Sequence, residues 1–193
     1  MYSLFISTYN KYIIIGLLKN GELINKKEQV SAQNHSVYTM SMIEDILKEN
    51  NIGTTYLNEI IVVNGPGSFT GVRIGVTIAK TLAYTLNIPI KTISSLEALA
   101  VSNDTKCNKL VTISDLKGKY IGYFNKDNIN LEPFTYLKNE EYKEYIKNKE
   151  KYILDKENID INKIYKYLRN KDSINAHLVN PIYIKGIDAL NGK

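Results

Sequence analysis

The sequence of 193 residues is poor in several residue types: it holds one cysteine, no tryptophan, two histidines and two arginines. The single cysteine, Cys107, excludes an internal disulfide and a metal cage built from cysteines. A reactive thiol needs a neighbouring base, and no histidine lies near Cys107 in the sequence. We therefore expect Cys107 to be a small, partly buried residue.

Long apolar runs are also missing, and none approaches the ~20 residues that cross a bilayer. The first residues lack the basic start, apolar core and small-residue cleavage site of a secretory signal. These features predict a soluble, cytoplasmic protein without a membrane partner. Hydrophobic residues make up 44% of the chain, which is enough for a sizeable core.

The net charge is +5, and lysine supplies almost all of the positive charge. Proteins that read nucleic acid usually use arginine and a clustered basic face. Here lysines and acids alternate, as in residues 138–144, which is typical of a solvated helix face. The sequence therefore carries no signature of direct RNA binding.

The first half of the chain alternates short apolar runs with helical patterns. We predict strands at 3–7, 12–18, 22–30, 59–63 and 89–93, with a turn at 19–21. Helices are predicted at 35–49 and 68–86, and a short one capped by Ser94 reaches Val101. Asn34 is the predicted cap of the first helix. Its apolar stripe is Val37, Met40, Ile43 and Leu47.

The second half repeats this order imperfectly. We predict strands at 110–114, 120–125, 130–136 and 152–154, and helices at 139–147 and 161–168. A doubled unit of three strands, helix, strand and helix indicates an α/β, actin-like (ASKHA, RNase H-like) fold. We expect a lobe at 1–102 and a similar but shortened second lobe at 103–193.

The most informative segment follows the strand at 59–63 and reads GPGSFTGVRIG from Gly65 to Gly75. A glycine-rich loop between a strand and a helix is a standard anion site. A Walker loop needs Gly-Lys-Ser/Thr, and a dinucleotide fingerprint needs GxGxxG with an acid about twenty residues later. The segment satisfies neither pattern.

Two glycines, Gly71 and Gly75, share one face of the predicted helix because they are four residues apart. Each costs about 1 kcal/mol relative to alanine, so another backbone is expected close to this face. That backbone belongs either to a partner or to this chain, and the spacing favours neither. A second stripe is expected to pack on the sheet: Val72, Val76, Ala79, Ala83 and Leu86.

The run from Gly65 to Gly75 resembles the hallmark of the TsaB (YeaZ) family, and weaker similarity covers most of the chain. It includes residues 6–8, 35–36, 113–115, 118–120 and 181–185. The motif and interface residues that follow from the resemblance are Gly65, Pro66, Gly67, Ser68, Phe69, Thr70, Gly71, Val72, Arg73 and Gly75, with Met40 and Ile43 on the first helix.

The resemblance implies a non-catalytic dimerisation or scaffold subunit for a TsaD-like transferase. With a TsaE-like ATPase, that complex moves a threonylcarbamoyl group onto the adenosine next to the tRNA anticodon. The resemblance also implies that the first two helices pair with those of TsaD, or with a second copy of the chain in its absence. No tightly bound cofactor is implied, and ATP or ADP at a subunit interface stays open. The tRNA is reached only through the complex.

Arg73 is read in two ways. It can hold a phosphate or a partner carboxylate bidentately, or it can form an intramolecular ion pair. Because the family motif includes it, we favour a role in the assembly or in the geometry of the loop.

Catalytic groups are missing where an actin-like enzyme needs them. Its carboxylates organise Mg²⁺ near the ends of the first strand of each lobe, but Ser7 and Ser114 occupy those places here. Asp115, one position later, is expected to be a turn or cap residue. His35 is followed at four residues by Thr39, so the two-histidine metal site of the catalytic sister family is not formed. No base is identified for Ser68 as a nucleophile.

Two other functions compete with the scaffold. A stand-alone ATP-binding phosphotransferase or ATPase would bind MgATP tightly in isolation. A direct tRNA binder would show strongly salt-dependent RNA affinity without partners.

Overall fold

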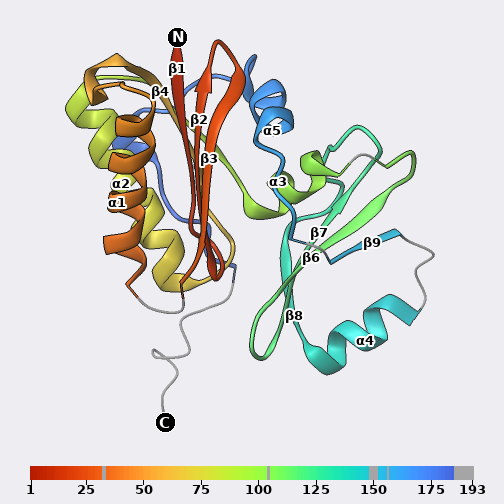
Figure 1. Ribbon diagram of the computed structural model, residues 1–193. Coiled ribbons are helices and arrows are strands. Elements are labelled where there is room, and N and C mark those ends of the chain that lie inside the picture. The colour runs from red at the N-terminus through yellow and green to blue at the C-terminus, as the bar shows by residue number, and fades with distance from the viewer. Residues whose placement is uncertain (32–33, 104, 148–151, 156, 185–193) are drawn as a thin grey trace.

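A computed structural model describes residues 1–31, 34–103, 105–147, 152–155 and 157–184. Two β-sheets lie side by side with helices between and around them (Figure 1). The first sheet has the order β3-β2-β1-β4-β5. Its strands are β1 (Tyr2–Ser7), β2 (Tyr12–Lys19), β3 (Glu22–Val30), β4 (Leu57–Val63) and β5 (Ile90–Ile93).

The first three strands pair antiparallel, while β4 and β5 run parallel to β1. The central strands β1, β2 and β4 are almost continuously buried runs of apolar residues, because helices cover both faces of the sheet. Asn20 and Gly21 make the predicted turn between β2 and β3, with φ values of 53° and 87°. Positive φ at two successive positions matches the twist of a tight hairpin.

Two helices, α1 (His35–Glu49) and α2 (Phe69–Leu86), cover one face of the first sheet. The opposite face carries α5 (Ile161–Leu168) and, next to it, α3 (Ser95–Ser102), which leads into the second sheet (Figure 1). No helix among the described residues combines the length and apolar character that crossing a membrane requires.

The second sheet repeats the topology of the first, with the order β8-β7-β6-β9. Its strands are β6 (Lys109–Ser114), β7 (Gly118–Phe124), β8 (Thr135–Lys138) and β9 (Tyr152–Leu154), and α4 (Asn139–Lys147) precedes β9. As in the first sheet, three antiparallel strands are followed by a helix and a strand parallel to the first. This repeat confirms the predicted actin-like fold, and in the described part of the chain the second sheet has no counterpart of β5.

The chain crosses back to the first sheet after β9. Gly16 of β2 packs so closely on α5 that a Cβ there would lie 2.6 Å from Cδ1 of Ile161. Further on, the backbone of Ile174 bridges to Ile90 of β5. The first sheet is therefore held by both ends of the sequence, although all of its strands lie before residue 94.

Five elements have the predicted limits: the helices at 35–49, 139–147 and 161–168 and the strands at 22–30 and 152–154. The strand predicted at 130–136 is wrong, since β8 begins at Thr135 and Asn130 makes only an isolated bridge to Phe124. Pro133 explains the difference, because it has no N–H to donate to a strand ladder.

Three local predictions also fail. The side chain of Asn34 makes no capping hydrogen bond, because its backbone is left-handed (φ 64°) and not extended as a capping residue needs. Cys107 is exposed, in the bend before β6. The apolar stripe of α1 is rotated: Val37 and Met40 are 66% and 40% exposed. The face of α1 that packs on the sheet is formed by Thr39, Met42, Ile43, Ile46 and Leu47.

Candidate functional site

The glycine-rich loop between β4 and α2 is tied to three parts of the chain. The Ser68 N–H donates to the Tyr9 carbonyl in the turn between β1 and β2 (2.6 Å). The N–H groups of Ser95 and Ile182 donate to the carbonyls of Gly65 (2.8 Å) and Asn64 (2.7 Å). Ser68 caps α2 by accepting from the Gly71 N–H at 3.2 Å. The Ser68 amide, at the start of α2 where an anion would bind, therefore already has a partner inside the chain.

The glycines of this segment allow the turn after β1 to approach α2. A Cβ at Gly71 would lie 2.1 Å from the carbonyl oxygen of Thr8, and one at Gly75 would lie 2.2 Å from Thr8 Oγ1. Thr8 Oγ1 in turn donates to the Gly71 carbonyl at 2.7 Å. Of the two readings of the glycine face, the internal one therefore holds. Gly71 and Gly75 are buried and do not meet a partner.

The motif residues divide into a buried set and an exposed set. Gly65, Pro66, Gly71, Val72 and Gly75 are buried, and Gly67 is half-buried. Ser68, Phe69, Thr70 and Arg73 are exposed. The stripe predicted to pack on the sheet is confirmed for Val72, Val76, Ala79 and Ala83, which are at most 2% exposed, while Leu86 is partly buried.

Arg73 is held by two aromatic rings. Its guanidinium carbon lies 3.7 Å from the ring centroid of Phe69 and 5.5 Å from that of Tyr183. Its Nε donates to the Tyr183 hydroxyl at 2.7 Å. Arginine stacks on aromatic faces as readily as it pairs with carboxylates, so these contacts replace the ion pair considered from the sequence. Arg73 thereby joins the start of α2 to the C-terminal segment.

We expect the Arg73→Ala substitution to lower the free energy of unfolding by about 1 kcal/mol, because a cation–π contact at an exposed site and one hydrogen bond are lost. Thr77→Ala, an exposed position on the same helix, is the matched control and is expected to change stability by less than about 0.5 kcal/mol. Urea denaturation measures both. Equal effects of the two substitutions would mean that the cluster adds nothing to stability.

The outer side of α1 and α2 exposes large apolar residues. Val37 (66%), Met40 (40%) and Tyr38 (39%) lie at the start of α1. Phe69 (39%) and Tyr84 (65%) lie near the two ends of α2. We call these five residues the α1–α2 surface. Met40 belongs to it as predicted for an interface residue, but Ile43 is 2% exposed and packs in the core. A partner cannot reach Ile43 directly.

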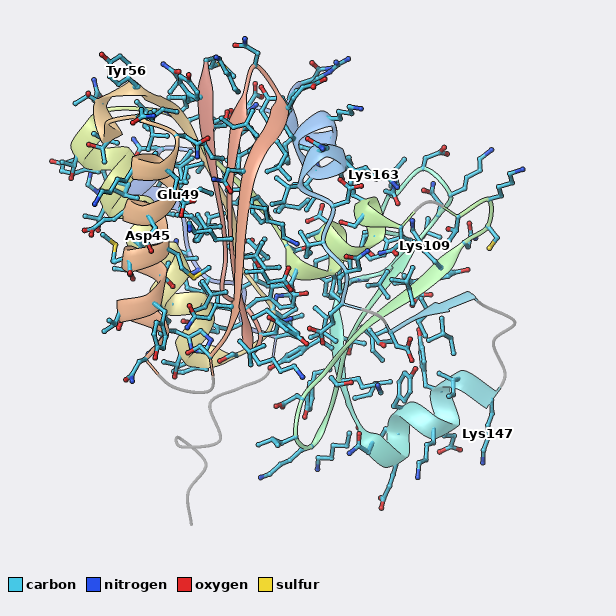
Figure 2. All side chains as sticks on the ribbon, in the orientation of Figure 1. Asp45, Glu49, Tyr56, Lys109, Lys147 and Lys163 are labelled. Carbon is cyan, nitrogen blue, oxygen red and sulfur yellow. The ribbon has the colours of Figure 1, made fainter. Side chains whose placement is uncertain are left out.

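The other end of α1 is fixed to the sheet. Glu49 pairs with Lys27 of β3 at 2.6 Å, and hydrogen bonds from Lys27 and Asn25 lower the pKa of its carboxyl. Asp45, one turn earlier, is exposed, and Figure 2 shows both side chains on α1. The apolar part of the α1–α2 surface on α1 is therefore limited to the first turns of that helix.

A cleft of about 1040 Å³ opens between the two lobes. Tyr9, Asn10, Ser68, Ser114, Asp115 and Glu157 are among the residues that line it. The Asn10 side-chain amide donates to Glu157 and so links the lobes. His35 Nε2 lies 3.1 Å from the Asn10 carbonyl oxygen, which accepts from it. His35, in the first turn of α1, thus supports the turn after β1, as a polar first-turn residue would.

Ser7, Ser114 and Asp115 lie at the strand ends where an actin-like enzyme would place its metal ligands. Ser7 is buried at the end of β1, and Ser114 accepts from Lys119 Nζ at 3.0 Å. Asp115 accepts from the Leu116 N–H (2.7 Å) and the Tyr136 hydroxyl (3.1 Å), as expected of a turn residue. In the part of the chain that is described, no three His, Cys, Asp or Glu residues are grouped to hold a metal ion.

Tyr9 lines the cleft and is 1% exposed. Burial, with a contribution from the Glu157 carboxylate, raises the pKa of its hydroxyl far above the ordinary value. The phenol is therefore neutral at physiological pH and cannot act as a base there.

Sequence reasoning missed several residues that hold these parts together. Lys109 is fully buried, and its Nζ donates to the carbonyls of Ala100 (2.6 Å) and Asn103 (2.8 Å) at the end of α3. Figure 2 labels Lys109 where the first lobe joins the second. No feature of the local sequence distinguishes this buried lysine from the exposed lysines near it in the chain. The capping box of Ser94 and Glu97, by contrast, has a recognisable pattern.

Comparison with known proteins gives three kinds of match. Residues 24–119 match the family model for TsaD, tRNA N6-adenosine threonylcarbamoyltransferase. The chain is 44% identical to the tRNA threonylcarbamoyladenosine biosynthesis protein TsaB of Bacillus subtilis over 97 residues, which is 50% of this chain and 42% of that protein. With the protein of the same description from Buchnera aphidicola subsp. Schizaphis graminum it shares 34% identity over 64% of this chain and 56% of that one.

Among solved structures, YeaZ from Pseudomonas aeruginosa superposes with a TM-score of 0.77. The superposition covers 94% of this chain and 99% of that chain at 18% sequence identity. At this identity the likeness establishes the shared fold alone. By sequence, the chain spans about half the length of the curated relatives it matches.

Proposed function

We propose that this chain, which is 44% and 34% identical to parts of two TsaB proteins, is a non-catalytic dimerisation and scaffold subunit for a TsaD-like transferase. In this function it supports threonylcarbamoylation of the adenosine next to the anticodon of tRNA. The proteins from Bacillus subtilis and Buchnera are described by this biosynthesis, which supports the assignment. Its site of action is the cytoplasm, and it reaches tRNA within the complex.

The observation that carries the proposal is the α1–α2 surface. Val37 and Tyr84 are each about two-thirds exposed, and large apolar side chains exposed along a solvent-facing helix pair support a protein interaction site. The same helices offer a shape that a second helix pair can fit, as in a four-helix bundle. The occupant is a TsaD-like subunit or, when that is absent, a second copy of this chain.

Serine at the ends of β1 and β6 supports a non-catalytic role. Mg²⁺ and phosphate need hard anionic oxygen ligands, and the hydroxyls of Ser7 and Ser114 cannot replace carboxylates. We propose that the chain alone holds no cofactor tightly. In the complex with a TsaE-like ATPase, ATP or ADP binds only at a subunit interface.

Light scattering after size-exclusion chromatography tests the partner directly, with the chain alone and mixed with the TsaD-like protein of the same source. A homodimer that converts to a heterodimer supports the proposal. A chain that ignores this partner contradicts it. Calorimetric titration with MgATP distinguishes the alternative of a stand-alone ATPase, for which tight binding by the isolated chain is expected.

The double substitution Val37→Glu and Met40→Glu is expected to weaken partner binding by about 30-fold or more, because two charges enter an apolar contact. Stability of the chain is expected to stay within about 1 kcal/mol, since both positions are exposed. Leu116→Glu with Ile129→Glu is the control, since these exposed apolar residues of the second lobe (96% and 60%) lie outside the α1–α2 surface. Unchanged binding by the first variant, or equal loss by both, would place the interface elsewhere.

A further inference from the structure

The segment from Ile161 to Lys171 is the most basic part of the described chain. It holds Lys163, Lys166, Arg169 and Lys171 and no acid within eleven residues. Its apolar side packs inward through Ile161, Ile164 and Leu168. Lys166, Arg169 and Lys171 are exposed. Elsewhere the sequence mixes lysines with acids. In this segment the basic residues have no acid among them, and the polar side of the segment faces solvent.

Residues from the first hairpin extend this basic surface. A Cβ at Gly21 would lie 2.7 Å from Cε1 of Tyr165, so the turn between β2 and β3 touches α5. That turn carries the exposed Lys19, two residues before Gly21. We call Lys19, Lys166, Arg169 and Lys171 the α5 basic surface.

Acids close to this surface are few, and some are already engaged. Asp160 caps α5 by accepting from the Lys163 N–H. Glu59 is buried and lies 3.4 Å from Lys91, whose Nζ also donates to the last carbonyls of α5. Glu22 and Asp172 are the exposed acids next to it in sequence. With Lys163 and Lys91 added to the four residues of the surface, six basic residues stand against these four acids, which gives a local charge of +2.

The geometry points to RNA as the occupant: we propose that the α5 basic surface binds the phosphate backbone of the RNA that the complex carries. This inference rests on the proposed function for the identity of the RNA. Lys166 and Arg169, the C-cap of α5, are three residues apart. At about 1.5 Å per residue, their Cα atoms are separated by about 4.5 Å along the helix axis. A row of cations complements a linear polyanion, and phosphate contacts supply most sequence-independent binding.

Two features of the fold favour RNA over other anionic partners. The exposed positions of α5 are Asn162 and Lys166, and its apolar residues are buried or half-buried, so the helix has no exposed apolar side to insert into a membrane. Moreover, α5 lies on the face of the first sheet opposite to α1 and α2 (Figure 1). A partner on the α1–α2 surface therefore leaves the α5 basic surface open, and both can be bound at once.

The test is RNA binding measured by fluorescence anisotropy with a labelled, unmodified tRNA transcript. The whole chain is titrated alone and with its TsaD-like partner, at 50 to 200 mM salt. The variant Lys166→Glu, Arg169→Glu, Lys171→Glu reverses three of the four charges of the α5 basic surface and leaves Lys19 in place. Its control is Lys138→Glu, Lys143→Glu, Lys147→Glu on and beside α4, which changes the net charge equally at exposed positions. Figure 2 shows Lys147 on α4, on a different part of the molecule from Lys163 on α5.

We expect the α5 variant to lose about tenfold or more in affinity and to lower the slope of log affinity against log salt by about 2 to 3, as the loss of three phosphate contacts predicts. The α4 control should lose less than about threefold. Equal losses of affinity by both variants would show diffuse electrostatic attraction and would overturn the inference. No loss of affinity by either variant would also overturn it. So would tighter binding of the chain to vesicles of acidic lipids than to RNA.

Failure of this inference is distinguishable from failure of the proposed function. Light scattering of the same α5 variant with the TsaD-like protein reports partner binding separately. If the α5 variant still forms the heterodimer and its RNA affinity is unchanged, only the proposed RNA contact is refuted. A chain that never joins that partner but loses RNA affinity in the α5 variant would refute the scaffold function and keep the basic surface.

Discussion

Replacing Gly71 by alanine is expected to lower the free energy of unfolding by about 3 kcal/mol. At an exposed helix position the same change stabilises by up to about 1 kcal/mol, because alanine is the better helix former. Here the added methyl would lie 2.1 Å from the carbonyl oxygen of Thr8. Because the obstacle is backbone, the turn after β1 must move away from α2, and such overpacking outweighs the gain in propensity.

Chemical denaturation of Gly71→Ala measures this effect, with Thr77→Ala on the exposed side of α2 as the control. The control should change stability by less than about 0.5 kcal/mol. A Gly71→Ala protein as stable as the original would mean that the approach of Thr8 to α2 is not required. The close contact of Gly75 with Thr8 Oγ1 also means that a bulky residue at Gly75 would disturb the fold, so it cannot probe a partner interface.

Replacing Lys109 by methionine is expected to cost about 3 kcal/mol. Methionine keeps most of the volume, but the carbonyls of Ala100 and Asn103 lose the ammonium donor that each has now. An unpaired buried carbonyl costs about 1–3 kcal/mol, and the C-terminal end of α3 also loses a cation that its dipole favours. Because α3 leads into β6, the loss should loosen the connection between the two lobes.

The control for Lys109→Met is Lys106→Met, which makes the same chemical change at an exposed position three residues earlier. Thermal or urea unfolding of the two proteins gives the comparison. We expect the Lys106 variant to stay within about 0.5 kcal/mol of the original protein. If both variants unfold alike, the buried ammonium contributes nothing that methionine cannot replace.

Much of the fold could be predicted because its local signals agree. Apolar runs bounded by Asn-Gly and by Pro predicted the strands of the first sheet, and apolar spacing predicted α4 and α5 to the residue. The repeat of the strand and helix order predicted the actin-like architecture. The failures were local: Pro133 shortened β8, and α1 turned Val37 and Met40 outward. Helical spacing defines a stripe but not which of its edges meets the sheet.

The sequence alone determined the class of fold, the resemblance to the TsaB (YeaZ) family through the run from Gly65 to Gly75, and the absence of carboxylates at Ser7 and Ser114. These properties depend on residue identity and on periodicity, which are local. Only the tertiary structure decided that Gly71 and Gly75 face Thr8 and not a partner, that Arg73 stacks on Phe69 and donates to the Tyr183 hydroxyl, and that Lys109 is buried. Each of these depends on segments far apart in the chain being brought together, and the distance between them is not encoded in any one segment.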